Sequence, residues 1–232
     1  MANKMYFKYL DNASMRVVVT EYPAIPIPSE RGEWQTVLGR EGQLWQGEGV
    51  ADEATLSVNL WIHPEADLGA VRAWLSGAGV LRFEPWGFYM EARINAPIVI
   101  TPSTFNDGWT TTATFSVHPA WYVYPPAGDI TVTTSGTIIE GAGNTKAKPL
   151  ITVYGSGDII LSVSGKSYTI NDLSGSITID SEYPTAYSGN QIMTHKIDDF
   201  GDAWPELNPD YTAISWTGSV TRVVITPRWR AG

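Results

Sequence analysis

The side chains best suited to acid–base or metal chemistry in this sequence are three histidines, His63, His118 and His195. They lie far apart along the chain, and none falls in a metal-binding spacing such as H-E-x-x-H. A histidine is poised for catalysis only where a neighbouring group orients it. We therefore interpret all three as ordinary hydrogen-bonded or surface residues and assign no catalytic histidine.

Acidic residues gather in the second half of the chain, where Asp180 and Glu182 precede Asp198, Asp199 and Asp202. Calcium favours several carboxylate oxygens around one loop, and a glycosidase needs two facing carboxylates. The D-x-D-x-D-G order of a calcium loop is absent, and 24 acidic residues make chance pairs inevitable. The pattern favours a solvated acidic loop.

Other common catalytic motifs are also absent from the sequence. The chain has no cysteine, which excludes disulfides, thiolate zinc sites and cysteine nucleophiles. The segment L-G-R-E-G at 38–42 matches neither G-x-x-x-x-G-K-[ST] nor G-x-G-x-x-G, and no G-x-S-x-G nucleophile elbow is present. We predict that the chain is not an enzyme and has no metal site and no cofactor.

The same segment is a candidate assembly loop formed by Gly39, Arg40 and Gly42. Its glycines permit positive φ and close backbone approach. Arg40 could then be presented to a partner carboxylate with bidentate geometry. The alternative is a solvated loop arginine that contributes little.

The aromatic residues are the remaining candidates for binding, since the chain has ten tryptophans and eleven tyrosines. Exposed aromatics stack sugar rings or anchor protein interfaces, and buried ones pack cores. Core packing is the interpretation we prefer for most of them. The candidates are Trp86, Phe88, Tyr89, Trp109, Trp121, Tyr122, Tyr124, Trp204, Trp216 and Trp229.

Composition predicts a folded chain, because 43% of its 232 residues are hydrophobic and only 17% are charged. A net charge of -9 argues against direct nucleic-acid binding. No apolar run approaches the ~18 residues of a membrane span, and the start lacks signal-peptide features. We expect no membrane association, and assembly in a cytoplasm.

The elements that would position these residues are mainly short strands. Residues 55–62 alternate polar and apolar side chains with the period of a half-buried strand, and 110–117 and 130–134 are rich in β-branched types. Residues 64–76 instead place apolar side chains at 3- and 4-residue spacing, which predicts one helix that ends near Gly77.

The composition shifts to Pro, Gly, Ala, Asn and Lys before residue 149, and we place a domain boundary between residues 144 and 145. Beyond it, closely spaced strands predict a β-sandwich. Turns are expected at Gly155-Ser156-Gly157, Ser164-Gly165 and Ser174-Gly175. The predicted strands are 149–154, 158–163, 166–170, 176–180 and 219–227.

The order and spacing of several segments resemble the distal tail protein family of siphophages along almost the whole chain. One departure is Leu38, where relatives often have proline before Gly-Arg. The landmarks are Arg31, L-G-R-E-G at 38–42, T-L-S-V-N-L-W-I at 55–62, the helix at 64–76, L-R-F-E-P-W-G-F-Y-M-E-A-R-I at 81–94, K-P-L-I-T-V-Y-G-S-G-D at 148–158, S-I-T-I-D-S-E at 176–182 and I-T-P-R-W-R at 225–230.

The resemblance implies two parts: residues 1–144 as an N-terminal β-sandwich-like belt with one helix, and residues 145–232 as a galectin-like β-sandwich. It implies a structural virion protein, assembled in the host cytoplasm, that forms a hexameric ring at the tip of a long non-contractile tail. Such a ring joins the tail tube protein to the tail-associated fibre or lysin protein, and in some phages carries receptor-binding proteins. The alternative function is a carbohydrate-binding adhesion module that recognises host cell-wall glycan.

Overall fold

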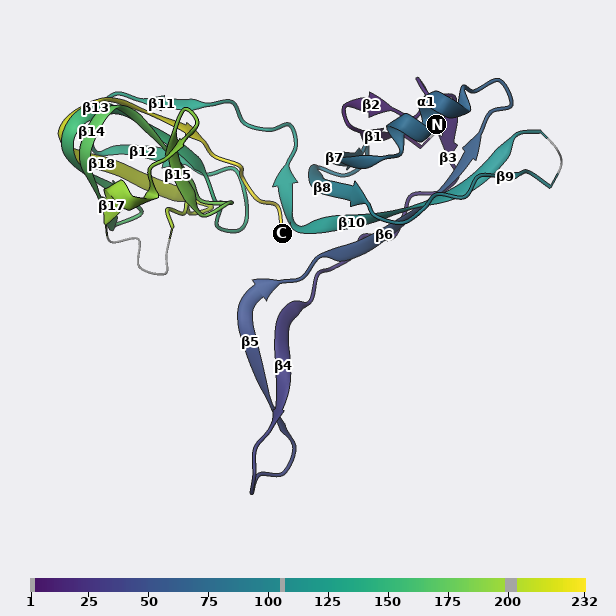
Figure 1. Cartoon of the computed structure of the whole chain (residues 1–232), viewed down its shortest axis with the longest axis horizontal. Helices are drawn as coiled ribbons and strands as arrows, with labels where there is room; N and C mark the ends of the chain where they lie inside the picture. The colour runs from purple at the N-terminus through teal and green to yellow at the C-terminus, as the bar shows by residue number, and fades with distance from the viewer. Residues whose placement is uncertain (1–2, 105–106, 199–203) are drawn as a thin grey trace. The chain divides into compact units, whose positions relative to one another are not determined.

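The computed structural model describes residues 3–104, 107–198 and 204–232. These residues are mainly β, with one α-helix, as predicted, and two main sheets (Figure 1). The chain divides into two compact units, an N-terminal unit of Met1–Trp121 and a C-terminal unit of Tyr122–Gly232. No helix in the described ranges is long and apolar enough to cross a membrane.

The N-terminal unit is built on a sheet in the order β2-β1-β7-β8-β10-β6-β3, with β9 beside β10. The predicted strands at 55–62 and 110–117 are present as antiparallel neighbours in β6 and β10. Alternation along β6 buries one side of the strand, because successive side chains point to opposite faces. The bounds are β1 Met5–Phe7, β2 Leu10–Asp11, β3 Val17–Val19, β6 Ala54–Ile62, β7 Gly77–Phe83, β8 Phe88–Ile94, β9 Thr101–Pro102 and β10 Trp109–Val123.

The helix α1 spans Leu68–Trp74 and is shorter than the predicted 64–76. Asp67 sets its start, because the Asp67 carboxylate accepts the first free backbone N–H groups as the N-cap. The buried Trp74 holds the helix on the sheet, where its indole Nε1–H donates to the carbonyl of Phe7 at 3.0 Å.

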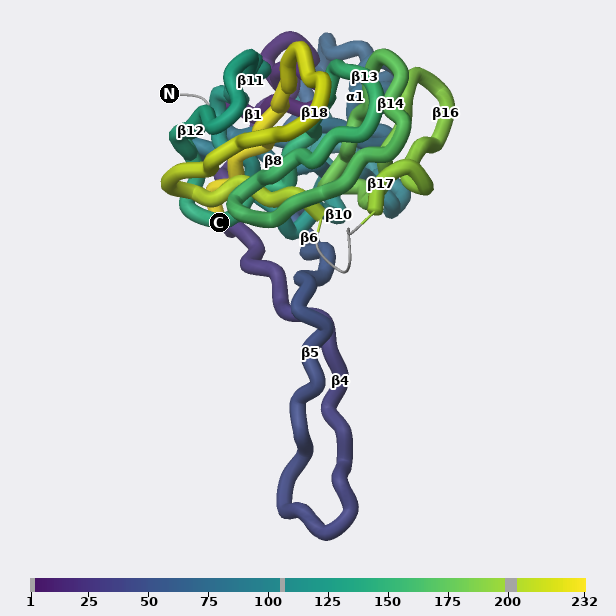
Figure 2. Tube along the Cα trace, turned by 90° about the vertical axis from the view of Figure 1, so that its left-hand side faces the viewer, coloured from purple at the N-terminus to yellow at the C-terminus, as the bar shows by residue number. Residues whose placement is uncertain are grey.

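Two further strands, β4 (Glu30–Thr36) and β5 (Gln43–Ala51), form a separate two-stranded sheet that we call the β4–β5 arm. Both views show the two strands running side by side to a tip, and β5 continues into β6 (Figures 1 and 2). Every residue of β5 is exposed. The sequence analysis did not predict this hairpin.

The C-terminal unit is one eight-stranded sheet in the order β11-β18-β13-β14-β15-β16, with β12 beside β18 and β17 beside β14. Its long strands curl so that side chains from both ends of β13 and β18 share one core. The bounds are β11 Ile130–Val132, β12 Thr137–Glu140, β13 Leu150–Val163, β14 Lys166–Asp180, β15 Thr185–Ser188, β16 Gln191–Ile192, the 3-10 helix η1 Thr194–Lys196, β17 Ile197–Asp198 and β18 Tyr211–Thr226.

Two turns predicted in this unit are wrong. The strands expected at 149–154 and 158–163 are the single strand β13, and those expected at 166–170 and 176–180 are the single strand β14. Gly155 pairs with Gly175 across them, and the register shifts after Gly157. The glycines permit a bulge that bends the pair without ending it. Only Ser164-Gly165 connects two strands, as predicted.

The division between the units differs from the boundary expected at 144/145. Strands β11 and β12 precede that boundary, yet both pair with β18. Val132 and Ile139 from these strands are buried in the core of the C-terminal unit. The turn-rich segment is therefore a loop of that unit. Independent folding of the two units stays a prediction.

Candidate assembly site

Two of the three histidines accept a hydrogen bond from a nearby backbone N–H group. His63 Nδ1 accepts the N–H of Glu65 at 3.1 Å, and His118 Nδ1 accepts the N–H of Ala120 at 3.2 Å. His195 lies in η1. Within the described ranges, no three His, Asp or Glu residues are grouped so that they could hold a metal ion. These contacts agree with the interpretation of ordinary hydrogen-bonded histidines.

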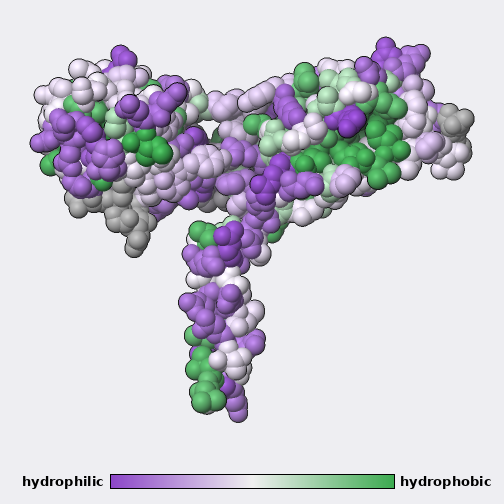
Figure 3. All heavy atoms as spheres, in the orientation of Figure 1, coloured by the Kyte–Doolittle hydropathy of each residue, from purple (hydrophilic) through white to green (hydrophobic). Residues whose placement is uncertain are grey.

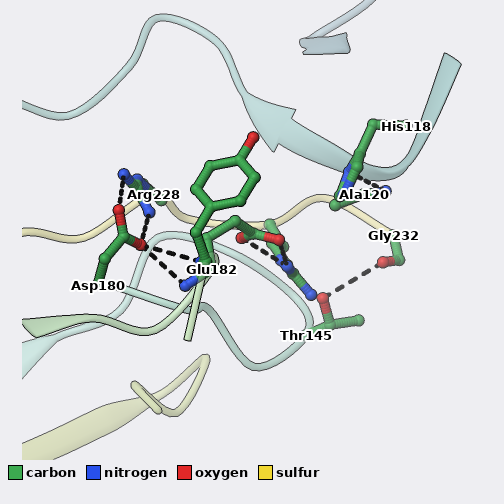
Figure 4. Close-up of polar contacts among 9 residues, drawn as sticks. His118, Ala120, Thr145, Asp180, Glu182, Arg228 and Gly232 are labelled. Atoms are coloured by element: carbon green, nitrogen blue, oxygen red, sulfur yellow. Dashed lines mark hydrogen bonds and ion pairs between the residues drawn. The ribbon is translucent and has the colours of Figure 1, made fainter. Parts of the chain in front are cut away.

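Asp180 and Glu182 do not belong to a solvated acidic loop, which corrects the prediction. The two carboxylate oxygens of Asp180 accept hydrogen bonds from the two Nη atoms of Arg228, at 2.7 and 3.2 Å (Figure 4). Arg230 donates to both carboxylate oxygens of Glu182 at 2.7 Å. The two carboxylate side chains are only 10% and 5% exposed. These pairs fasten the C-terminal segment to the end of β14.

Burial alone would lower the pKa of Arg228, but the hydrogen bond and charge of Asp180 outweigh it and raise the pKa. The guanidinium therefore stays charged beside its partner. The same segment is also held by the backbone, since Val123 N–H donates to the carbonyl of Trp229 at 2.9 Å. Thr145 Oγ1 donates to the carbonyl of Gly232 at 3.3 Å (Figure 4). Both the Asp180 and the Glu182 carboxylate are therefore engaged in holding the C-terminal segment.

The rest of the predicted acidic cluster is Asp198, Asp199 and Asp202. The Asp198 carboxylate accepts a hydrogen bond from Asn171 on β14. Asp199 and Asp202 lie outside the described residues. Among the described residues, Asp180, Glu182 and Asp198 do not form a group that could hold a metal ion.

Most of the candidate aromatic residues pack in the cores, as preferred from the sequence. Phe83, Trp86, Phe88 and Trp121 form a chain of ring contacts in the N-terminal unit, with centroids 4.5 to 5.2 Å apart. In the C-terminal unit Trp229 is buried in the core. These rings contribute apolar area to folding.

The candidate assembly loop lies at the tip of the β4–β5 arm. Gly39 and Gly42 both have positive φ, +81° and +78°, and Arg40 N–H donates to the carbonyl of Val37 at 3.2 Å. Arg40 is exposed and makes no ion pair with any residue that the structure describes. Figure 3 shows apolar atoms in green at this tip, where Leu38 is fully exposed. A role in assembly stays a prediction.

A pair of tryptophans on the arm was missed. Trp34 and Trp45 are direct cross-strand partners, with ring centroids 5.1 Å apart, and Trp34 is 63% exposed. Gly32 and Gly47 are also paired, so G-x-W and W-x-G are mirrored about the tip. That mirrored pattern is the sequence signal that could have revealed both the hairpin and the exposed pair.

Three exposed ion pairs lie at the root of the arm. Arg31 Nε donates to Asp52 at 2.7 Å, and Arg31 also lies 3.9 Å from Glu48. The hydrogen bond to Asp52 raises the pKa of Arg31. In addition, Glu53 at the entry to β6 pairs with Arg93 of β8 at 2.7 Å. These exposed ion pairs connect β4 with the end of β5 and the residue before β6 with β8.

No model of a known protein family matches this sequence, and no curated protein matches it. Solved structures do match. The Dit (gp 19.1) protein of phage SPP1, described as a paradigm of the hub adsorption apparatus in phages that infect Gram-positive bacteria, aligns with a TM-score of 0.69 at 14% identity. The alignment covers 97% of this chain and 98% of that protein.

Two structures of the phage P2 baseplate in its activated conformation also contain a similar chain. The structure with calcium aligns with a TM-score of 0.53 at 10% identity and covers 97% of both chains. The structure with strontium aligns with a TM-score of 0.52 at 10% identity and covers 98% of this chain and 99% of that one. The chain thus has the fold of a phage tail-tip hub protein over both of its units.

Proposed function

We propose that this chain is a structural virion protein that forms a hexameric ring at the distal end of a long non-contractile phage tail. The observation that carries the proposal is the likeness to the SPP1 Dit protein over 97% of the chain. An alignment of that extent includes both units, so it supports a shared role better than a single common domain would. The protein would be assembled in the host cytoplasm and work in the virion.

As the hub, the ring would join the tail tube protein to the tail-associated fibre or lysin protein. It would also offer an attachment point for a receptor-binding protein. A closed ring of identical chains requires two different complementary surfaces on each copy. We propose the exposed β4–β5 arm and the sheet of the N-terminal unit as these two surfaces.

A structural role suits the chemistry of the described residues better than catalysis does. The partly buried carboxylates Asp180 and Glu182 are held by arginines, and two of the three histidines accept backbone N–H groups. A net charge of -9 suits a channel that must let DNA pass without holding it. Because most candidate aromatic residues pack in cores, we do not propose glycan recognition as the main function.

The proposal is tested by measuring the mass of the purified chain by light scattering over a range of concentrations, followed by negative-stain microscopy. We expect a ring with six times the 25.4 kDa mass of the chain, alone or after addition of the tail tube protein. Antibody labelling of phage particles should mark the tail tip. A strict monomer under all conditions, or label elsewhere on the particle, would contradict the proposal.

A further inference from the structure

An open groove separates the helix α1 from the segment 95–100 that follows β8 in the N-terminal unit. Its volume is about 650 Å³, which lies within the range of known ligand sites. Figure 3 shows apolar atoms gathered on the N-terminal unit around the position of α1 in Figure 1. The apolar residues that line the groove are buried or half-buried, and they are Leu68, Val71, Leu75, Ile94, Ile98 and Ile100.

The groove is basic where α1 ends. Arg72 lines the groove, is exposed and pairs with no acidic residue in the part of the chain that the structure describes. Lys8 Nζ lies 3.7 Å from the position that a Cβ atom of Gly77 would take, and Gly77 lines the same groove. No Asp or Glu is among the described lining residues, although acidic residues outnumber basic ones by 24 to 15 in the whole chain. The groove therefore favours an occupant that carries negative charge beside its apolar groups.

The backbone and the stem of Lys8 are held against β7. Lys8 has a positive φ of +52°, and its N–H donates to the carbonyl of Val80 at 3.1 Å. A Cβ atom at Gly79 would come within 2.6 Å of Lys8 Cγ, so glycine at this position leaves room for the lysine stem. Because the stem is already ordered, the ammonium loses less conformational entropy when it binds an anion.

The segment 95–100 adds free main-chain groups to the groove. It is neither helix nor strand, and the N–H groups of Ile98 and Ile100 make no hydrogen bond with any residue in the described ranges. The carbonyls of an extended peptide can accept such N–H groups, as they do where a peptide binds along a strand. A fatty acid has a carboxylate and an apolar chain, but it offers no carbonyls along its length. A peptide therefore satisfies more of the groove than a lipid does.

We infer that this groove binds a short segment of another tail protein, which has apolar side chains at alternate positions and a carboxylate near Arg72 and Lys8. The inference rests on the proposed function for the source of the partner, and it adds a site and the chemistry of its ligand. The 7 residues of α1 span ~10 Å. An extended peptide of three to four residues covers the same length, so a short segment fills the groove.

The test uses overlapping short peptides that tile the tail tube protein and the tail-associated fibre or lysin protein of the same phage. Binding of each labelled peptide to the full chain is measured by fluorescence anisotropy. We expect binding by peptides that carry alternate apolar residues next to Asp, Glu or a C-terminal carboxylate. If no such peptide binds, while the chain forms its ring, the inference fails and the proposed function stands.

Charge variants test the basic end of the groove. Arg72→Gln and Lys8→Gln should each raise the Kd of the tightest peptide by ~3- to 5-fold, and the double variant should raise it by ~10-fold or more. The melting temperature should stay the same, because neither side chain belongs to the core. Lys166→Gln removes an exposed charge from the C-terminal unit and is the matched control that should bind like the wild type. Equal weakening by all three single variants would indicate a general charge effect and contradict the inference.

Two adjacent residues test the apolar wall. Ile98 is half-buried and lines the groove, whereas Val99 is 68% exposed and does not line it. Ile98→Thr should raise the Kd by ~5-fold or more, and Val99→Thr should leave it unchanged. If Ile98→Thr shows no melting transition, the wild type is titrated with two peptides that are N-methylated at opposite sets of alternate residues. Methyl groups on the edge that faces the segment block main-chain pairing, so one peptide should bind and the other should not. Equal affinity of the two methylated peptides would overturn the inference.

Cross-linking identifies what occupies the groove, and it is direct because the chain has no cysteine of its own. A photo-reactive label on Ser76→Cys, which lines the groove, should cross-link to the bound peptide, and the same label on Lys166→Cys should not. Cross-links from Ser76→Cys to a second copy in the assembled ring would make the groove a contact between copies. Tighter binding of oleate than of any peptide would make it a lipid site. Either result would overturn the inference.

Discussion

The pairing of β11 and β12 with β18 predicts where the chain can be cut. A fragment of residues 122–232 keeps both strands and should fold by itself, whereas residues 145–232 lose them and should not fold cooperatively. The shorter fragment is the domain expected from the sequence. It would expose one side of β18 at both ends, along Val223–Ile225 and along Tyr211–Ile214.

The expected loss follows from the buried side chains. Val132 and Ile139 are 3% and 5% exposed in the core of the C-terminal unit. Fully burying a side chain of this size contributes ~1.5 to 3 kcal/mol, so the two together contribute ~3 to 6 kcal/mol. A small domain is stable by only ~5 to 15 kcal/mol in total. Cutting at residue 145 therefore removes a large part of the free energy of unfolding.

The measurement is urea unfolding of the two fragments, followed by circular dichroism. Within residues 122–232, Ile139→Ala should cost ~2 to 5 kcal/mol. The adjacent Ile138 is 67% exposed, so Ile138→Ala is a matched control that should change stability by less than ~0.5 kcal/mol. If residues 145–232 unfold cooperatively with the same stability as residues 122–232, the contribution assigned to β11 and β12 is wrong.

Three further predictions concern single side chains. Asp180→Asn removes the carboxylate charge that binds the partly buried Arg228 and should lower the free energy of unfolding by ~3 kcal/mol. Glu84→Gln, in an exposed pair, should cost less than ~1 kcal/mol, and urea titration measures both. Arg40→Ala should weaken oligomer formation by light scattering and leave the monomer melting temperature unchanged, and normal rings would discard its assembly role. Burial raises the pKa of Tyr168, so the folded state holds this proton more tightly than the unfolded state. The contribution of this proton to stability is complete below about pH 10 and is lost as the pH rises through the raised pKa of Tyr168. Between about pH 8 and about pH 11, the Tyr168→Phe variant should therefore lose less free energy of unfolding than the wild type. An equal loss in both proteins would refute this.

Much of the fold class is encoded locally. The alternation in 55–62 predicted β6, and the spacing in 64–76 predicted the one helix, although Asp67 starts that helix later than expected. The composition also excludes disulfides and thiolate chemistry, because the chain has no cysteine. Period and composition act over a few residues, so they can be read without knowledge of the rest of the chain.

The features that matter for the candidate site depend on pairing between distant segments. Arg228 and Arg230 each bind a carboxylate 48 residues away, and Ile139 is buried only because β12 pairs with β18. Glycines that predict turns from the sequence lie inside β13 and β14. The two strands stay paired on both sides of the register shift, so neither strand ends at its glycines. Likewise, Trp34 and Trp45 become one aromatic face only when the hairpin register places them opposite each other. Local sequence specifies the strands, but register and burial arise from non-local contacts, and only the tertiary structure decides those.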